Sequence, residues 1–264
     1  MNVKILFKTI VFLLLITLAI LFSFPLVRDW KAAKTKRDLP EIKAKKILAV
    51  VTEYNSRDFY VEGDSIAGFQ YDLCKYIAQR SGLTVQIFLE NDLKTAIQKL
   101  ENNKYDVIAQ NIPITNENKQ YLAFTVPIAQ NKQVLVQRIP SDTDSVAFVD
   151  NQLDLANKTV YVTKDSPSIL RIKHLAEEIA EPIHIEEIAG CTSEHLIYMV
   201  AQKEIDYAVV DKEIASKNAQ LFSGLDFNTD ISFTQLQAWA LRKNAPVLLD
   251  SLNVWIMAFK MGKK

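Results

Sequence analysis

The chain has 264 residues and balances 31 lysine and arginine residues against 31 aspartate and glutamate residues. Hydrophobic residues make up 49% of it, so the chain can bury a substantial core and is not a disordered protein. The charge balance lacks the basic excess that nucleic-acid binding requires, so no nucleic-acid partner is predicted.

The first 27 residues differ in composition from the rest of the chain. Residues 10–27 carry no charge and follow Lys4 and Lys8. Eighteen helical residues span about 27 Å, which is close to the thickness of a bilayer core. No small-residue cleavage site borders the run, which favours an uncleaved signal-anchor, with a cleaved signal peptide and a secreted product as the alternative.

A charged segment, 28–46, follows the apolar run and is interpreted as a linker. It carries eight basic and three acidic residues. The positive-inside rule alone would keep such a segment in the cytoplasm. The distribution of charge therefore does not decide on which side of the membrane the rest of the chain lies, and this has to be inferred from other features.

From residue 47 onward, predicted strands and helices alternate. Short apolar runs predict strands at 47–51, 84–89, 105–109, 133–137, 159–162, 183–188, 206–210 and 235–241. Helical periodicity and capping residues predict helices at about 70–81, 91–100, 166–180 and 193–203, from 212, and at 246–259. This alternation predicts α/β lobes with largely parallel sheets.

Motifs for common enzyme chemistry are missing from the sequence. With six glycines, the chain contains neither a G-x-G-x-x-G nor a P-loop motif, and it has no G-x-S-x-G elbow. The three histidines are scattered, and two cysteines cannot form a metal-binding set. Cys74 falls on an apolar helix face and is interpreted as a buried thiol. The sequence therefore predicts no catalytic residue, metal or cofactor.

Four segments carry a resemblance to a known family. They are AGFQYDL at 67–73, YDVI at 105–108, ITNEN at 114–118 followed by LAFTVP and the strand QVLVQ, and EIDYAVVD at 204–211. In this order and spacing they resemble the extracellular solute-binding proteins of family 3, which have the type II periplasmic-binding fold. The match covers about 47–260.

The stretch DLPEI at 38–42 is also similar to the binding-protein-like N-terminal domain of the membrane-bound lytic murein transglycosylase F family. In that family a lysozyme-like catalytic domain follows, for which no residues remain here. The sequence is therefore interpreted as that of a binding protein and not of an enzyme.

The family resemblance implies two lobes joined by a hinge, with the ligand in the cleft between them. Lobe 1 would comprise 47–137 and 232–264, and lobe 2 would comprise 140–226. The resemblance also favours export, which would place the domain in the periplasm or on the extracytoplasmic face of the bacterial inner membrane.

Candidate ligand contacts follow from the same alignment of motifs. Asn118 stands where amino-acid-binding members carry an arginine that grips the ligand carboxylate, so that clamp is in doubt. Asp211 matches the acid that pairs with the ligand ammonium group, although it could equally cap the next helix. Gln110 and Asn111 follow the strand predicted at 105–109, at positions that the resemblance places before a loop, and could form hydrogen bonds with a ligand.

Further candidates lie on loops of both lobes. Ser166 precedes a lobe 2 helix whose free N–H groups suit an anion, although Ser166 could instead cap that helix. Tyr54, Arg57 and Phe59 follow the first strand, where the family places an aromatic side chain over the ligand. Arg57 could replace the cation lost at position 118.

The predicted function is extracytoplasmic binding of a small polar solute, amino-acid-like or peptide-like, for transport or sensing. An ABC permease or a cell-wall enzyme would then be the partner. The alternative is a non-catalytic relative of the murein lytic transglycosylases that binds cell-wall fragments or a partner protein.

Overall fold

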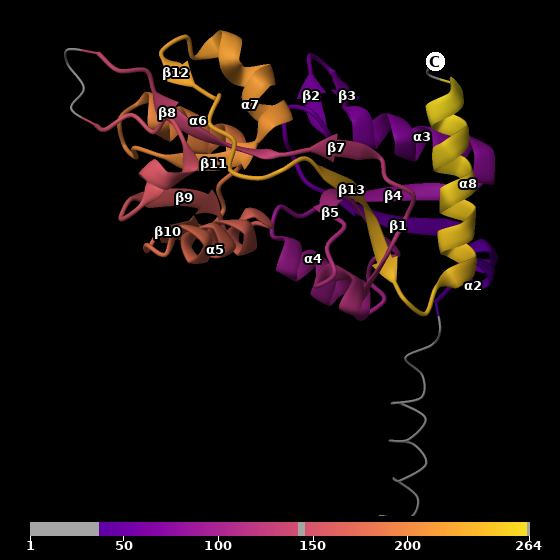
Figure 1. Ribbon diagram of the computed structural model, residues 1–264. Helices are drawn as coiled ribbons and strands as arrows, with labels where there is room; N and C mark the ends of the chain where they lie inside the picture. The colour runs from indigo at the N-terminus through magenta and orange to yellow at the C-terminus, as the bar shows by residue number, and fades with distance from the viewer. Residues whose placement is uncertain (1–36, 142–145, 263–264) are drawn as a thin grey trace, which may run out of the picture. The chain divides into compact units, whose positions relative to one another are not determined.

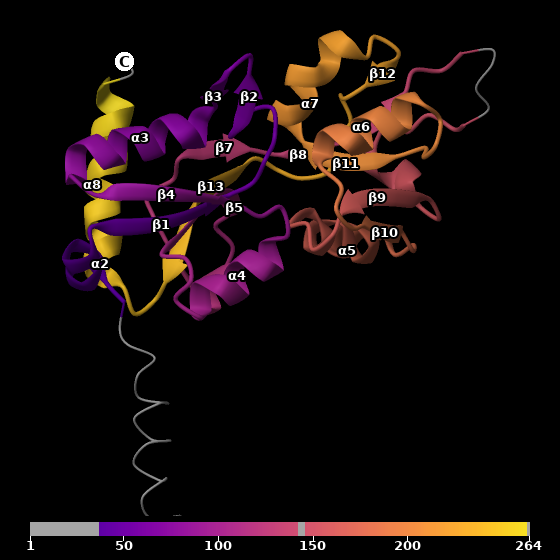
Figure 2. The same cartoon turned by 180° about the vertical axis from the view of Figure 1, so that it is seen from behind.

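The computed structural model describes residues 37–141 and 146–262, so the predicted signal-anchor at 1–27 lies outside the described residues. From Asp38 onward the chain forms two α/β lobes, each built around its own sheet (Figures 1 and 2). Within the described ranges, none of the helices combines the length and the apolar character that a membrane span needs. The predicted two-lobed α/β architecture is confirmed.

The sheet of lobe 1 has the strand order β4-β1-β5-β13-β6, and β7 also pairs with β13. Parallel pairing joins β1 to β4 and β5, whereas β13 runs antiparallel to β5, β6 and β7. The sheet is therefore mixed and not largely parallel, because the returning chain inserts β13 in the opposite direction. The strands are β1 (Ile47–Thr52), β4 (Thr84–Leu89), β5 (Val107–Pro113), β6 (Leu122–Phe124), β7 (Ala129–Asn131) and β13 (Gln235–Arg242).

Helices cover both faces of this sheet, as Figure 1 shows. On one face lie α2 (Leu39–Lys45), α3 (Phe69–Ser81) and α8 (Pro246–Gly262), and on the other lies α4 (Leu93–Glu101). Successive side chains of a strand point to opposite faces, so Val50 joins the α3 and α8 core while Val51 packs with α4. This two-sided burial explains why β1 reads as a continuous apolar run. A small hairpin, β2 (Tyr60–Glu62) and β3 (Ser65–Ala67), precedes α3.

Helix α2 occupies part of the segment that the sequence assigned to a linker. The Asp38 carboxylate accepts the N–H of Leu39 at 2.8 Å, and Glu41 completes a capping box by accepting the N–H of Asp38 at 3.0 Å. The same carboxylate accepts the N–H groups of Val247 at 3.2 Å and Leu248 at 2.8 Å in the first turn of α8. Two helix N-termini thus share one anion that is 3% exposed, and the folded domain begins at this residue.

The sheet of lobe 2 has the strand order β10-β9-β11-β8-β12. Strand β9 runs parallel to β10 and β11, and β8 runs antiparallel to β11 and β12. Helix α5 packs on one face, and α6 and α7 pack on the other. The elements are β8 (Gln133–Arg138), β9 (Thr159–Thr163), α5 (Ser168–Ile179), β10 (His184–Ile188), α6 (Ser193–Ala201), β11 (Ala208–Asp211), α7 (Lys212–Asn218) and β12 (Leu225–Asp226). Short 3-10 turns lie at Gln152–Leu155 and Ala219–Leu221 in this lobe and at Asn118–Gln120 in lobe 1.

The chain crosses between the lobes at two adjacent points. The first crossing lies at Lys132, between β7 and β8, and the second leads from Asp230 into β13. The ammonium group of Lys132 pairs with the carboxylate of Asp230, and the Gln133 N–H donates to Ser232 Oγ at 2.9 Å. Because β8 pairs with β11, the run at 133–137 belongs to lobe 2, and the predicted lobe boundary was a few residues too late.

Most predicted elements of the α/β alternation are present, but β5 and β11 each begin two residues later than predicted. Strand β5 begins at Val107 and not at Tyr105. The residue before it, Asp106, is fully buried and uses its side chain to join neighbouring elements. Its carboxylate accepts the Ala49 N–H at 2.9 Å and pairs with the buried Arg242 at 3.3 Å. Both cysteines are free and buried, which confirms the buried thiol at position 74.

Candidate functional site

A small cavity of about 80 Å³ lies between the two lobes. Lobe 1 contributes the residues just after β1 and the end of β5, and lobe 2 contributes the ends of β9 and β11. Ligands of α/β sheets bind outside the carboxyl ends of parallel strands, and both lobes present those ends here. The cavity is well below the volume of about 300 Å³ at which small-molecule sites begin, so in this form it accepts only a compact molecule.

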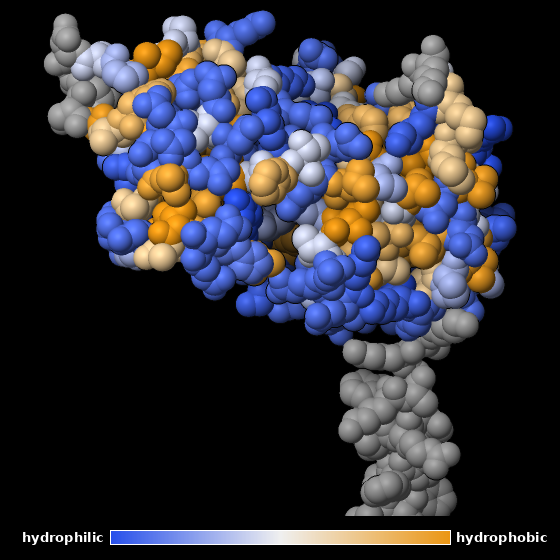
Figure 3. Space-filling view, in the orientation of Figure 1, coloured by the Kyte–Doolittle hydropathy of each residue, from blue (hydrophilic) through white to orange (hydrophobic). Residues whose placement is uncertain are grey.

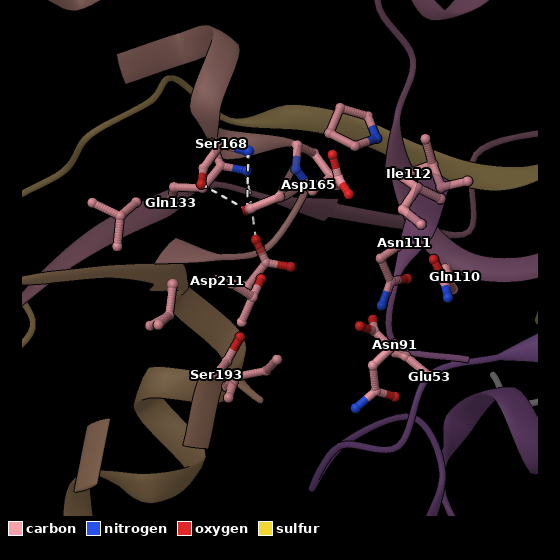
Figure 4. A pocket seen from close by; sticks show the side chains of 18 of the residues that line it. Glu53, Asn91, Gln110, Asn111, Ile112, Gln133, Asp165, Ser168, Ser193 and Asp211 are labelled. Carbon is pink, nitrogen blue, oxygen red and sulfur yellow. Dashed lines mark hydrogen bonds between the residues drawn. The ribbon is translucent and has the colours of Figure 1, made fainter. Parts of the chain in front are cut away.

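The lining residues form two opposed groups, as Figure 4 shows. Glu53, Asn91, Gln110 and Asn111 stand on the lobe 1 side. The lobe 2 side carries Gln133, Asp165, Ser168, Ser193 and Asp211. Polar side chains thus face each other across the cavity from both lobes.

Glu53 follows β1 directly and brings a carboxyl group to the lobe 1 wall. Burial raises the pKa of Glu53 to about 8, and the carboxylates of Asp58, Asp211 and Glu194 add to the rise while Arg57 opposes it. The neutral form of Glu53 is therefore favoured near neutral pH when the cavity is empty.

Asp211 ends β11 and occupies the N-cap position of α7, yet its side chain makes no capping hydrogen bond. Its carboxyl faces the cavity and accepts a long hydrogen bond of 3.5 Å from Gln133 Nε2. Burial raises the pKa of Asp211 to about 6, although the nearby Arg57 guanidinium opposes the rise. The structure thus brings Asp211 to the cavity and leaves its alternative role as a cap unfilled.

Two buried glutamines have polar atoms without partners in the described part of the chain. Gln237 is fully buried and lines the cavity, and neither its amide oxygen nor its amide nitrogen has a hydrogen bond of ordinary geometry. Its dipole still favours the charged form of the nearby Asp211. Gln133 is 4% exposed, and its Oε1 is likewise unpartnered. Buried polar groups left unpaired are costly, so these amides indicate a place for a hydrogen-bonding ligand.

The turn into α5 lines the lobe 2 side of the cavity. Ser166 Oγ and Ser168 Oγ lie 2.8 Å apart, and Ser166 Oγ also accepts the Ser168 N–H at 3.3 Å. The hydroxyl of Ser166 therefore serves both the turn and the cavity wall. The helix itself begins at Ser168, with Pro167 at its N-cap.

The structure brings Gln110, Asn111, Ser166 and Asp211 of the predicted contacts to the cavity. The amide nitrogen of Gln110 donates to the Glu90 carbonyl at 2.8 Å. Asn111 Nδ2 donates to the Asp58 carboxylate at 2.7 Å, and this bond directs the Asn111 amide into the lobe 1 framework.

The other predicted contacts do not line this cavity. Tyr54 is 43% exposed, and Phe59 is buried edge-to-face against Tyr71. Arg57 reaches across to lobe 2 and pairs with Glu213 at 2.5 Å. These three residues thus belong to the framework and rim of the cleft in this structure.

Asn118 lies in a second, outer groove between α4 and α5. Its Nδ2 donates to the Pro113 carbonyl at 3.0 Å, and its Oδ1 accepts the Tyr121 hydroxyl at 2.8 Å. The groove has a volume of about 720 Å³ and corresponds to the recess between the lobes in Figure 3. Among the described residues that line the inner cavity, none carries a guanidinium group that could replace the arginine expected at position 118.

Direct contacts between the lobes hold this arrangement together. The Ser56 N–H donates to Glu194 Oε1 at 2.7 Å, the Lys217 ammonium donates to the Ser56 carbonyl, and Asn218 Nδ2 donates to Ser56 Oγ at 3.3 Å. These contacts, together with Arg57–Glu213, are called the interlobe latch below. The latch ties the loop after β1 to α6 and α7, so the lobes are closed over the cavity.

Glu53, Gln133 and Gln237 were missed as candidate site residues. Glu53 could have been found, because it is the first polar residue after a buried parallel strand, where such strands present ligand contacts. Gln133 begins β8 and Gln237 lies within β13, but the sequence does not show which face of either strand points to the cleft.

Known proteins share both the sequence pattern and the fold. The model of the bacterial extracellular solute-binding proteins, family 3, matches residues 47–263. Membrane-bound lytic murein transglycosylase F of Desulfosudis oleivorans is 28% identical over 208 residues, which cover 78% of this chain and 44% of that protein. The protein of the same name from Shewanella loihica is 24% identical over 226 residues, covering 84% of this chain and 46% of that protein.

Among solved structures, holo ArgBP from T. maritima superimposes with a TM-score of 0.71 and 25% identity. The match covers 84% of this chain and 94% of that chain. The present chain thus spans less than half the length of the two transglycosylases but matches the ArgBP chain over nearly its full length.

Proposed function

Because this chain belongs to the bacterial extracellular solute-binding proteins of family 3, we propose that it binds a small polar solute in the interlobe cleft, on the extracytoplasmic side of the membrane, for transport or sensing. The observation that carries the proposal is the closed cavity at the carboxyl ends of strands from both lobes. The amide oxygen of its buried Gln237 has no hydrogen-bond donor in the described protein, and a ligand would supply one.

The proposed mechanism is hinge closure around the solute. The two crossings at Lys132 and Asp230 lie side by side, so the lobes can rotate about them with little change inside either lobe. Closure would bring Glu53 and Asp211 around the solute and shield it from water. The described residues supply binding groups only, and we propose no catalytic step. An ABC permease would be the partner in transport, with the segment 1–27 as membrane anchor.

A thermal-shift screen of the intact chain in mild detergent tests this proposal. The panel would contain amino acids, short peptides, amines, sugars and organic acids. A ligand present at 100 times its dissociation constant adds about 2.7 kcal/mol to the free energy of unfolding, which gives a clear rise in melting temperature. A folded chain that responds to no member of the panel would contradict solute binding.

A second candidate function rests on the transglycosylase relatives. The similarity to membrane-bound lytic murein transglycosylase F favours a domain that binds cell-wall fragments or contacts a cell-wall enzyme. Adding muropeptides to the same screen separates the two functions. A shift with muropeptides alone would select this second function.

A further inference from the structure

Acidic side chains outnumber basic ones in the wall of the inner cavity. Glu53, Asp165 and Asp211 line it, and Lys164 is the one cation among the described residues that do so. The Lys164 ammonium lies 3.5 Å from the Asp92 carboxylate and 3.9 Å from that of Asp165, so its charge is already shared between two acids. The cavity therefore presents more negative than positive charge to whatever enters it.

The groups that could hold a ligand carboxylate are directed elsewhere. Asn118 stands where a guanidinium fork would be expected, and its amide is bonded to the Pro113 carbonyl. The Arg57 guanidinium is 2.5 Å from the Glu213 carboxylate and outside the cavity. An anionic group entering this cavity would meet acids and no available guanidinium among the described lining residues.

Buried hydrogen-bond acceptors without donors also favour a positively charged ligand. The amide oxygens of Gln133 and Gln237 are buried in the cavity wall and have no partner in the described protein. An ammonium group supplies three donors and a positive charge, and so satisfies neutral acceptors and carboxylates together. A neutral solute would satisfy the amides but would add no positive charge beside Glu53 and Asp211, whose nearby cation, Arg57, is already paired with Glu213.

A metal ion is a poorer match to this wall. Among residues 37–141 and 146–262, no set of three or more histidine, cysteine, aspartate and glutamate side chains converges closely enough to hold a metal. The carboxyls of Glu53 and Asp211 stand on opposite sides of the cavity, as Figure 4 shows. An organic cation can extend between them.

We propose that the cleft selects a compact organic cation, a primary ammonium compound that needs no carboxylate, held between Glu53 of lobe 1 and Asp211 of lobe 2. The inference rests on the proposed function, solute binding in this cavity, and specifies the charge of the solute. The amide oxygens of Gln133 and Gln237 accept the remaining N–H groups. The same cation offsets the repulsion that Asp58, Asp211 and Glu194 exert on Glu53.

Isothermal titration calorimetry of the intact chain in mild detergent, at pH 8, tests the proposal. Two pairs of probes differ in charge but hardly in shape: ethylenediamine against ethylene glycol, and putrescine against butanediol. L-Alanine and L-arginine carry both an ammonium and a carboxylate group, and succinate carries carboxylates only. We expect binding of the amines and no binding of the diols or of succinate.

Three variants test which side chains contribute to the affinity for amines. Glu53→Gln and Asp211→Asn should each weaken amine binding about ten- to hundredfold, the usual effect of removing one charged hydrogen-bond partner. Glu62→Gln, an exposed substitution of the same chemistry in the β2–β3 hairpin, should leave the affinity unchanged. Circular dichroism and urea unfolding of each variant establish that it is folded.

The outcomes separate the charge assignment from solute binding itself. If the amino acids bind and the plain amines do not, the cation proposal is wrong while the proposed function stands. If the amines bind equally well to Glu53→Gln and Asp211→Asn, the assignment to these two acids is wrong. If no probe binds the folded chain, the cation proposal is wrong, and the proposed function fails with it when the thermal-shift panel gives no response either.

Discussion

The substitution Glu53→Gln should raise the free energy of unfolding of the ligand-free protein, and the gain should grow with pH. Burial, helped by the carboxylates of Asp58, Asp211 and Glu194, raises the pKa of Glu53 from 4.5 to about 8. The unfolded carboxyl ionises near pH 4.5, so between these pKa values the folded state holds a proton that the unfolded state has lost. The stability that Glu53 contributes is complete below pH 4.5 and is lost as the pH rises through about 8.

The size of the effect follows from the two pKa values. Each pH unit between them removes about 1.4 kcal/mol, so the loss approaches about 5 kcal/mol at pH 8 if the cleft stays closed. Opening of the lobes would rehydrate Glu53 and limit the loss to the free energy of opening. We therefore expect a measured difference of about 2 to 5 kcal/mol at pH 8.

Urea unfolding of the parent chain and of Glu53→Gln, at pH 4.5 and at pH 8, measures this difference. The exposed substitution Glu62→Gln serves as the control and should follow the parent at both pH values. If the parent and Glu53→Gln differ by the same free energy at both pH values, Glu53 does not titrate in a buried site and the electrostatic argument fails.

Substitutions at three further positions test how the structure is held together. Asp38→Ala removes the acceptor shared by α2 and α8 and should cost about 2 to 4 kcal/mol in urea unfolding, with Asp38→Asn losing less because it keeps an oxygen. Gly68→Ala should cost several kcal/mol, more than an ordinary helix-start substitution, because Gly68 has a φ of 127° and an added Cβ would overlap the Asp58 carbonyl. Glu194→Ala removes the acceptor of the Ser56 N–H, and small-angle scattering of the ligand-free chain should then show a larger radius of gyration, whereas an unchanged radius would mean that the latch does not control closure.

The fold could be predicted from the sequence because the motif residues are required by the local geometry at the points where elements meet. Gly68 is the second residue of the first motif and adopts a backbone conformation that other residues rarely adopt. Asp106 of the second motif anchors β5 to β1 through the Ala49 N–H and pairs with Arg242 at the end of β13. Such residues determine how neighbouring elements are joined. Their order along the chain therefore indicates the fold.

The lobe boundary and the antiparallel strands could not be predicted in the same way. The run at 133–137 is apolar whether it packs in lobe 1 or in lobe 2, and only its pairing with β11 decides between them. That pairing joins segments far apart in sequence. Likewise, Asp38 shows a capping pattern for α2, but nothing local reveals that it also caps α8.

The candidate site was the least predictable part, because a polar side chain takes its direction from distant partners. Arg57 is drawn to Glu213 in the other lobe, and Asn118 turns to the Pro113 carbonyl. The resemblance named both positions as candidates but could not say where their side chains point. Glu53 has no motif of its own, and its importance arises from the acids that the fold brings around it.

Closure of the hinge is opposed by the same acids that would hold a ligand. Glu53 and Asp211 come from different lobes, so closing the cleft moves both carboxyls into one poorly hydrated space. The pKa of Asp211 is raised to about 6 and that of Glu53 to about 8, so near pH 7 the closed, empty cavity keeps a proton on Glu53. A bound ammonium group would take the place of that proton, and binding should therefore release a proton to the buffer. The calorimetric enthalpy of amine binding near pH 7 should accordingly vary with the ionisation enthalpy of the buffer in the parent chain and not in Glu53→Gln. An enthalpy independent of the buffer in both chains would mean that the cation does not meet Glu53.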